Sequence, residues 1–342
     1  MTVRVAVVGL GMALKPHLQS LRELSEEGRV TIAACYAPSA EHRHKFSEAN
    51  PDLPIAQELD GILRDGGIDA VLLLTPPFTH LDLVERSAAA GKHVLVEKPL
   101  DITTERARRS VAAAERAGVR LGVVLQHRFR TAARELADLV ASGALGPLVS
   151  GSASIRWWRD ASYFAQPGRG MKERDGGGVL MTQAIHTLDL FQHLAGGVAE
   201  VSAMAATSPL RRIDTEDVVA AAIRFENGAL GTIDATTVSY PGFPERIELA
   251  CEKATAVLQA ESLEVFDKDG RHDRREGSTA GGGGADPMAF SHEAHKALIT
   301  DFVDAVETGR DPRVSGRAAL KVHALIDALL RSAAERRPVA IA

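Results

Sequence analysis

The chain has 342 residues and a formal net charge of −5, and 45% of its residues are hydrophobic and 25% are charged. This composition is typical of a water-soluble protein with room for two hydrophobic cores, and its mild acidity argues against a nucleic acid as the main partner. Because no apolar run reaches about 18 residues, we expect no membrane span. The first residues lack the pattern of a secretion signal, which predicts a cytoplasmic protein.

The first third of the chain alternates short apolar runs with amphipathic stretches. The predicted strands are residues 3–8, 30–36, 70–75, 93–96 and 121–125, and the predicted helices are residues 14–27, 57–64, 81–90 and 103–117. Such alternation is typical of a parallel sheet with crossover helices. The strands are almost continuously apolar, so we expect helices on both faces. Residues 1–125 are therefore predicted to form a doubly wound α/β domain of the Rossmann type.

The pattern changes after residue 125. Predicted helices at residues 131–142, 176–194, 289–308 and 315–336 surround predicted strands at residues 149–158, 199–206, 218–225, 230–237, 247–251, 256–260 and 263–267, and the glycine-rich stretch 279–286 predicts a flexible loop. Consecutive strands joined by turns favour antiparallel pairing. Residues 126–342 are therefore predicted to form an α+β domain with a large, open, mostly antiparallel sheet, whose C-terminal helices can pack back on the first domain.

A candidate dinucleotide-binding turn follows the first predicted strand. Gly9 and Gly11 stand where the chain passes from the strand into a helix, and Met12 follows them. Gly9 permits a tight turn, and Gly11 lets the backbone approach a pyrophosphate that the helix N-terminus can bind. Leu14 replaces the third glycine of the usual G-x-G-x-x-G pattern, so this motif alone leaves a plain strand–turn–helix open.

The end of the second predicted strand bears on the choice of cofactor. In NAD-binding domains this strand usually ends in a carboxylate that accepts hydrogen bonds from the adenosine ribose. Here Ala37 stands at the expected position, and Ser39 and Arg43 follow it, with His42 between them. These side chains suit a 2′-phosphate, which favours NADP over NAD, although side chains that simply face solvent would give the same pattern.

Three motifs together resemble one protein family. They are residues 75–80 (T-P-P-F-T-H), residues 97–99 (E-K-P) and residues 176–189, where three glycines precede H-T-L-D. At this separation they are similar to the glucose–fructose oxidoreductase / inositol dehydrogenase (Gfo/Idh/MocA) family, and the resemblance covers nearly the whole chain. It implies a Rossmann domain followed by a domain built around an open sheet. It also implies an enzyme that oxidises or reduces sugars and cyclitols with NAD or NADP.

The resemblance implies roles for single residues as well. Lys98 corresponds to the lysine near the reacting hydroxyl, and His186 corresponds to the histidine that accepts or donates its proton. Relatives of this kind need no metal, and the outer face of their large sheet often forms a dimer contact, so we expect a homodimer or homotetramer. The candidate cofactor-binding residues are Gly9, Gly11, Met12, Ala37, Ser39, Arg43, Thr75, Pro76, His80, Glu97, Lys98 and Gln126.

Elementary chemistry agrees with the role of Lys98. In open α/β sheets, ligands bind beyond the C-terminal ends of the strands, where Thr75, Pro76 and Lys98 stand. A fixed ammonium group at such a place orients a substrate oxygen and stabilises negative charge that develops on it. A solvated lysine that ends a strand is the alternative.

The glycine-led helix carries a polar stripe on an otherwise apolar surface. At about 100° per residue, Thr182, His186, Asp189 and His193 fall within an arc of roughly 60°. Imidazole is suited to proton transfer near neutral pH. A core histidine bonded to a carbonyl oxygen is the alternative, and a zinc site made from this spacing is not expected, because no cysteine stands nearby.

One position departs from the resemblance. Inositol-type members of the family carry Asp four residues before the histidine, where this chain has Thr182. A hydroxyl group can donate a hydrogen bond but cannot stabilise an imidazolium by charge. We therefore expect His186 to be a weaker base unless Gln183 or Asp189 supports it, and we doubt that inositol is the substrate.

Aromatic and basic residues gather between residues 126 and 172. Such residues recur in carbohydrate sites, because aromatic faces stack on sugar rings and hydroxyl groups need donors. A core or interface cluster is the alternative. The candidate substrate-binding residues are Lys98, Arg128, Trp158, Tyr163, Thr182, Gln183 and His186.

These observations predict an NAD(P)-dependent oxidoreductase that transfers a hydride between nicotinamide and a carbinol or keto carbon of a sugar, sugar derivative or cyclitol. Two other hypotheses keep the fold. One is a redox-assisted glycosidase with tightly held NAD, which would show no net NADH formation. The other is a non-catalytic, nucleotide-binding regulator, which would bind the cofactor without turnover.

Overall fold

The computed structural model describes residues 2–166, 168–277 and 291–341, so the stretch 279–286, predicted as a flexible loop, lies outside the described residues. The chain divides into two compact units. The first consists of residues 1–126 and 291–320, and the second of residues 127–290 and 321–342. The long helix α11 (Gly316–Glu335) therefore begins in the first unit and ends in the second.

The first unit contains a five-stranded parallel sheet in the order β2-β1-β3-β4-β5. Its strands are β1 (Val3–Val8), β2 (Val30–Tyr36), β3 (Ala70–Leu73), β4 (His93–Val96) and β5 (Leu121–Val123), and its helices are α1 (Leu14–Glu26), α2 (Ala40–Ala49), α3 (Leu59–Arg64), η1 (Pro77–Thr79), α4 (His80–Ala89), α5 (Thr104–Ala117) and α10 (Glu293–Thr308). Because β3 and β4 are buried along their whole length, both faces need covering.

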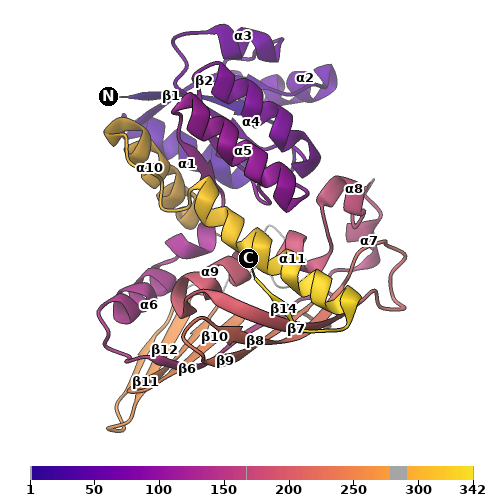
Figure 1. The fold of residues 1–342 in the computed structure, drawn as a ribbon. Coiled ribbons are helices and arrows are strands. Elements are labelled where there is room, and N and C mark those ends of the chain that lie inside the picture. The colour runs from indigo at the N-terminus through magenta and orange to yellow at the C-terminus, as the bar shows by residue number, and fades with distance from the viewer. Residues whose placement is uncertain (1, 167, 278–290, 342) are drawn as a thin grey trace. The chain divides into compact units, whose positions relative to one another are not determined.

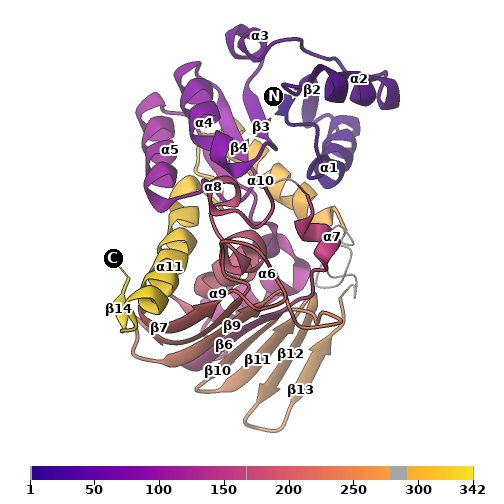
Figure 2. The ribbon, with the colours of Figure 1, turned by 90° about the vertical axis from the view of Figure 1, so that its right-hand side faces the viewer.

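The two faces of this sheet are covered by different helices. Helix α4 packs against α5, and α1 packs against α10, which comes from the late part of the chain (Figures 1 and 2). The strand order reverses between β1 and β3, which is where open α/β sheets bind their ligands. The predicted doubly wound architecture is confirmed.

The second unit contains a nine-stranded sheet in the order β13-β12-β11-β10-β6-β9-β8-β7-β14 (Figure 2). Its strands are β6 (Leu148–Arg156), β7 (Val198–Ala206), β8 (Val218–Phe225), β9 (Leu230–Thr236), β10 (Arg246–Cys251), β11 (Ala254–Gln259), β12 (Ser262–Asp267), β13 (His272–Arg275) and β14 (Val339–Ala340). All neighbours pair antiparallel except β6 and β9, which are parallel. The predicted open, mostly antiparallel sheet is confirmed.

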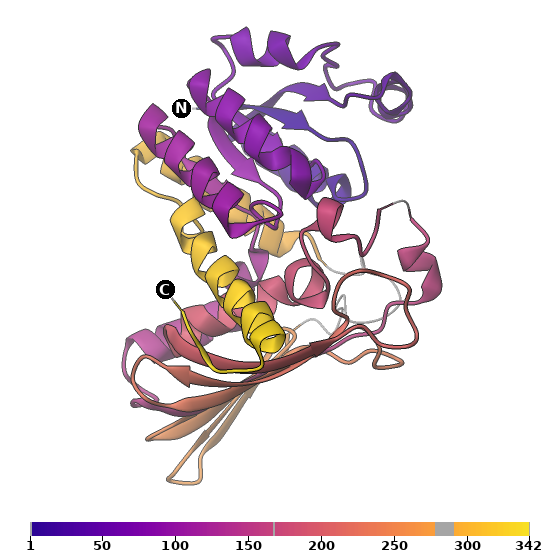
Figure 3. The same cartoon turned by 45° about the vertical axis from the view of Figure 1, so that its right-hand side comes forward.

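Helices of the second unit lie on one face of this sheet. Helix α9 (Ile185–Ala195) packs against β6 and β10, and α6 (Thr131–Ala141) packs against β11 and β12 (Figure 3). The remaining short helical segments are η2 (Gln126–Phe129), α7 (Ala161–Phe164), α8 (Lys172–Asp175) and one π-helical turn, η3 (Leu180–Ala184). None of the helices in the described part of the chain combines the length and apolarity needed to cross a bilayer.

The opposite face of the sheet carries small and polar side chains. Ser202 of β7 pairs with Ala222 of β8, which pairs with Thr232 of β9, and these three residues are exposed. Met204, in the next row of this face, is 81% exposed. This face is thus flat and open over several strands.

Strand β13 was not predicted from the sequence. All four of its residues are exposed, so it has no alternation of buried and exposed side chains that a sequence pattern can reveal. It forms the edge of the sheet by pairing with β12.

His323 of α11 is a buried histidine in the second unit. Its side chain is fully buried, and neither ring nitrogen has a hydrogen-bond partner. Burial lowers the pKa of His323 to about 4. In the unfolded chain this histidine takes up a proton below the ordinary histidine pKa of about 6.5, whereas in the folded state it stays neutral at the same pH. The stability that this residue supports is therefore fully present above pH of about 6.5 and is lost as the pH falls towards 4.

We expect this effect to remove about 2 kcal/mol from the free energy of unfolding between pH 7 and pH 5. The variant His323→Leu should lack this part of the acid sensitivity, because it has no group to protonate. Melting temperatures of both proteins at the two pH values measure the difference, with His44→Leu on the exposed side of α2 as the control. Equal losses in the wild type and His323→Leu would contradict the assignment.

Candidate active site

The turn after β1 is shaped by glycine. Gly9 has a φ of 110°, and a Cβ atom there would lie 2.6 Å from the carbonyl carbon of Leu74. A side chain would therefore collide with the end of β3. A Cβ atom on Gly11 would have nothing within 4 Å. The turn at Gly11, just before α1, is thus open towards solvent, as the binding of a pyrophosphate near this helix N-terminus requires.

The segment after β2 places the residues that bear on cofactor choice. Ala37 is buried, and the Ser39 hydroxyl accepts a hydrogen bond from the backbone N–H of His42, which caps α2. The guanidinium of Arg43 donates to the carbonyl oxygens of Ala37 and Pro38 at 2.7 and 3.0 Å, and it lies over the ring of Tyr36. Arg43 thus holds a positive charge at the C-terminal end of β2.

His80 links the two turns that follow β3 and β4. Its side chain is fully buried, with Nε2 at 2.9 Å from the carbonyl oxygen of Thr75 and Nδ1 at 3.0 Å from that of Pro99. Burial lowers the pKa of His80. This placement suits support of the two turns better than direct contact with a cofactor.

The residues after β4 form a charged and hydrogen-bonded turn. One carboxylate oxygen of Glu97 lies 2.7 Å from Nε2 of His17 on α1, and the other accepts the backbone N–H of Lys98 at 2.9 Å. Burial opposes ionisation of Glu97, but the hydrogen bond from His17 and the charges of His17, Lys98 and His295 outweigh it and lower the pKa of Glu97 to about 2. Because an ionised carboxylate only accepts, Nε2 of His17 carries the proton.

Helix α10 completes this cluster. His295 meets the ring of His17 edge to face, with 5.0 Å between the ring centroids. Ligand atoms of His17, Glu97 and His295 all lie within 4.8 Å of one another, a spacing that a metal ion can use. However, the His17–Glu97 hydrogen bond engages the atoms such an ion would need, so we interpret the cluster as hydrogen-bonded. It fixes the carboxylate next to the backbone of Lys98.

In the second unit, the glycine-led entry explains the start of the helix that carries His186. Gly176 adopts a φ of 81° at the end of α8, and a Cβ atom on Gly178 would lie 1.7 Å from the carbonyl oxygen of Glu216. The Glu216 carboxylate accepts hydrogen bonds from the backbone N–H groups of Gly178 and Leu180, both at 3.1 Å. Burial raises the pKa of Glu216, and these bonds lower it. Glu216 therefore caps the helix, and only glycine fits at 178.

The polar stripe predicted for this helix is modified by the π-helical turn η3. Thr182 lies in that turn, and its hydroxyl contacts the carbonyl oxygen of Gly178 at 2.7 Å and the side-chain oxygen of Gln183. The amide of Gln183 donates to the hydroxyl of Tyr163 at 3.1 Å. Thr182 and Gln183 are therefore tied to each other and to Tyr163.

His186 and Asp189 lie in the regular part of the helix, α9. His186 is 7% exposed, and its ring stacks on that of His127, with 4.8 Å between centroids. Asp189 accepts two hydrogen bonds from the guanidinium of Arg128, at 2.6 and 2.5 Å. Burial raises the pKa of Asp189, and the charge and hydrogen bonds of Arg128 lower it. Asp189 is thus the buried partner of Arg128.

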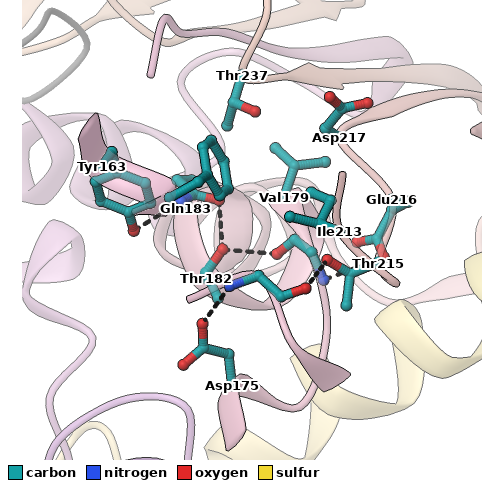
Figure 4. Close-up of a pocket in the computed structure, with 13 residues that line it drawn as sticks. Tyr163, Asp175, Val179, Thr182, Gln183, Ile213, Thr215, Glu216, Asp217 and Thr237 are labelled. Atoms are coloured by element: carbon teal, nitrogen blue, oxygen red, sulfur yellow. Dashed lines mark hydrogen bonds between the residues drawn. The ribbon is translucent and has the colours of Figure 1, made fainter. Parts of the chain in front are cut away.

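A pocket adjoins this helix within the second unit. It is lined by Tyr163, Phe164, Gly170, Asp175, Gly178, Val179, Thr182, Gln183, Ile213, Thr215, Glu216, Asp217 and Thr237 (Figure 4). The hydroxyl of Tyr163, the amide of Gln183 and the hydroxyl of Thr182 form a connected row along one wall. The buried hydroxyl of Thr237 has no hydrogen-bond partner. These groups suit a ligand that carries hydroxyl groups.

Arginine side chains stack on the aromatic residues near this pocket. Arg211 lies over the rings of Trp158 and Phe164, and Arg169 lies over the ring of Tyr163. Trp158 also meets Tyr240 edge to face. Tyr163 and Phe164 line the pocket, whereas Trp158 does not. Of the two aromatic residues predicted to bind substrate, Tyr163 therefore lines the pocket. Trp158 instead belongs to the stacked side chains near it.

Sequence reasoning missed three functional candidates in these two units. His17 lies two residues beyond Lys15 and was not singled out, and His127 stands beside residues that were. Glu216 lies far along the chain from the helix that it caps. No local pattern marks any of the three, because each acts on a residue that is distant in the sequence.

Comparison with known proteins gives matches along most of the chain. The profile described as the oxidoreductase family with an NAD-binding Rossmann fold matches residues 3–125. The profile described as the GFO/IDH/MocA C-terminal domain matches residues 133–257. Together these two matches cover the sheet of the first unit and most of the sheet of the second.

Several proteins that match nearly the whole chain are named dehydrogenases. The chain is 27% identical to inositol 2-dehydrogenase of Rhizobium meliloti, over 100% of both chains. It is 30% identical to D-apiose dehydrogenase of Paraburkholderia graminis, over 98% of this chain and 88% of that one. The crystal structure of the WlbA dehydrogenase of Bordetella pertussis, in complex with NADH and UDP-GlcNAcA, matches with a TM-score of 0.84 and 28% identity, over 100% and 99% of the two chains.

Proposed function

The chain belongs to the Gfo/Idh/MocA family of oxidoreductases with an NAD-binding Rossmann fold, and from this premise we propose that it oxidises a carbinol carbon of a sugar, sugar derivative or cyclitol. One observation carries the proposal. A buried imidazole, His186, stands on α9 directly after the π-helical turn η3, whose Thr182 and Gln183 line a pocket of hydroxyl and amide groups, although His186 is not itself a lining residue. The names of these relatives, which refer to inositol and apiose, support the substrate class.

The first unit fits a bound dinucleotide. Gly9 keeps the end of β1 against β3, and the open turn at Gly11 lets a pyrophosphate approach the N-terminus of α1. When bound, the cofactor supplies a nicotinamide ring that accepts a hydride. The turns after β3 and β4, joined by His80, are the candidates to contact that ring.

We propose that two side chains act on the same substrate hydroxyl. Lys98 orients the oxygen and stabilises the negative charge that develops as the C–H bond breaks. His186 accepts the hydroxyl proton as general base and returns it when the reaction runs towards reduction. Tyr163, Thr182 and Gln183 bind the other hydroxyl groups of the substrate.

An absorbance assay at 340 nm tests the proposal. The purified protein is incubated with NAD⁺ or NADP⁺ and a panel of polyols, aldoses and their derivatives. We expect at least one compound to give steady formation of reduced cofactor. Cofactor binding without absorbance change on the whole panel would contradict the proposal, and release of an aglycone from glycosides without net NADH would favour the redox-assisted glycosidase.

The choice between NADP and NAD rests on Arg43. Its guanidinium lies at the end of β2, where a 2′-phosphate is expected, which supports NADP. We expect Arg43→Ala to raise the KM for NADP⁺ by about tenfold, the effect of one lost charged hydrogen bond, with little change in the KM for NAD⁺. Steady-state kinetics with both cofactors measure this, with Arg108→Ala on the exposed face of α5 as the control. Equal changes for the two cofactors would remove Arg43 from cofactor selection.

We also propose that the protein forms a homodimer or homotetramer through the open face of the nine-stranded sheet. The exposed row of Ser202, Ala222 and Thr232 and the exposed Met204 support this, because small side chains let two sheets approach closely. Light scattering after size exclusion measures the mass. Ala222→Arg should shift the protein to the monomer, and an unchanged mass would exclude this face.

A further inference from the structure

The orientation of His186 needs an explanation. An imidazole that accepts a proton must hold one ring nitrogen within hydrogen-bond reach of the substrate hydroxyl. The neighbouring polar groups serve other contacts. Thr182 is bonded to Gly178 and Gln183, and Asp189 is held by two hydrogen bonds from Arg128. Both residues are therefore engaged in hydrogen bonds of their own.

A second imidazole covers the face of His186. The rings of His127 and His186 lie 4.8 Å apart and only 26° from parallel. His127 is 4% exposed and His186 is 7% exposed, so the pair is almost fully enclosed. Offset stacking at such a distance is a favourable arrangement for flat rings, and it restricts rotation of each ring about its side-chain bonds.

The stack is set by an ion pair one residue away. His127 and Arg128 are neighbours in η2, and His186 and Asp189 are one turn apart on α9. Arg128 donates hydrogen bonds to Asp189 through Nε and Nη2, and its Nη1 lies 3.4 Å from Nδ1 of His193. Because Arg128 anchors η2 to the helix at 189, the preceding residue lies over 186. The two pairs form one rigid unit.

We propose that His127 is a positioning residue that holds the imidazole of His186 in its proton-accepting orientation through ring stacking. The inference rests on the proposed function, because it assigns His127 a part in the same proton transfer. In this arrangement the flat ring of His127 fixes the plane of His186.

The experiment compares two substitutions at this position. His127→Leu keeps an apolar side chain but removes the flat ring, and His127→Phe keeps the ring. The control is His272→Leu, because His272 also stacks on a ring, that of Phe266 at 4.3 Å, but lies exposed on the edge strand β13. For each protein, kcat, the KM for cofactor and substrate, and the melting temperature are measured with the best substrate of the panel.

We expect His127→Leu to lower kcat by about tenfold to a hundredfold, the effect of a displacement near 1 Å at the reacting group. The KM for the cofactor should not change, and His127→Phe should restore kcat to within about threefold of the wild type. The His272→Leu variant should match the wild type. As a spectroscopic check, the ring protons of His186 in the wild type should show a ring-current shift that His127→Leu abolishes and His127→Phe retains.

Two outcomes would overturn the inference. One is wild-type kcat in folded His127→Leu, and the other is equal loss in the Leu and Phe variants, which would mean that the ring itself does not matter. Absence of the ring-current shift in the wild type would also refute the stack. An enzyme with turnover but no dependence on His127 refutes this inference alone, whereas a protein without turnover on the whole panel refutes the proposed function.

Discussion

Replacement of His186 by Gln lowers kcat by about 10²–10⁴-fold, the range that general acid–base catalysis contributes. Gln fills a similar volume and keeps hydrogen-bonding groups, but it cannot accept the hydroxyl proton. Because His186 belongs to the second unit and the dinucleotide-binding turn to the first, we expect the dissociation constant for NADH to stay within about twofold of the wild type. Steady-state kinetics and the fluorescence of bound NADH measure the two quantities.

A matched control lies two turns further along the same helix. Burial, with the charges of Arg128 and Lys321, lowers the pKa of His193 to about 4, so this ring is neutral near pH 7. His193→Gln should retain kcat to within a few-fold. Equal losses in the two variants would mean that the effect is structural, and full activity of His186→Gln would remove His186 from the mechanism.

Replacement of Lys98 by Met lowers kcat by about 10²–10³-fold, the effect of removing one group that stabilises charge in the transition state. Met has nearly the same length, so the change removes the ammonium and little else. The turn should persist, because His17 and the backbone N–H of residue 98 hold Glu97 in place. Lys98→Arg should restore little, since a planar guanidinium presents its donors in a different geometry.

The same assays test this prediction, together with the melting temperature. Lys45→Met is the surface control, because Lys45 is exposed on α2 and pairs only with Glu41 among the ion pairs of the described residues. A folded Lys98→Met variant that binds NADH and turns over at the wild-type rate would contradict the role of the ammonium.

The architecture was predictable because its signals are local. The apolar runs that form β1 to β5 are short and separated by helical patterns, and the turn at Gly9 follows directly from a strand. The parallel pairing of β6 and β9 was not predictable, because residues 148–156 and 230–236 are separated by two other strands and several helical segments. Only the packing of the sheet brings them together.

The residues that support the candidate site could not be predicted either, because they are distant in the sequence from the residues they contact. Glu97 depends on His17, which is 80 residues away, and Asp189 depends on Arg128, which is 61 residues away. The sequence also predicted a regular α-helix through Thr182 and His186. In the structure Thr182 lies in a π-helical turn, so the two residues do not have the angular spacing of a regular α-helix. Candidate site residues can thus be identified from motifs, but the side chains that hold them in place can be identified only from the structure.

A crystal structure with NADH and a polyol from the panel tests the central claim most directly. The account predicts that the amine of Lys98 and one ring nitrogen of His186 both lie within about 3.2 Å of the same hydroxyl oxygen. It also predicts that the carbon bearing that hydroxyl lies about 3–3.5 Å from C4 of the nicotinamide. A substrate oxygen bound by neither group, or the two groups on separate surfaces, would contradict it.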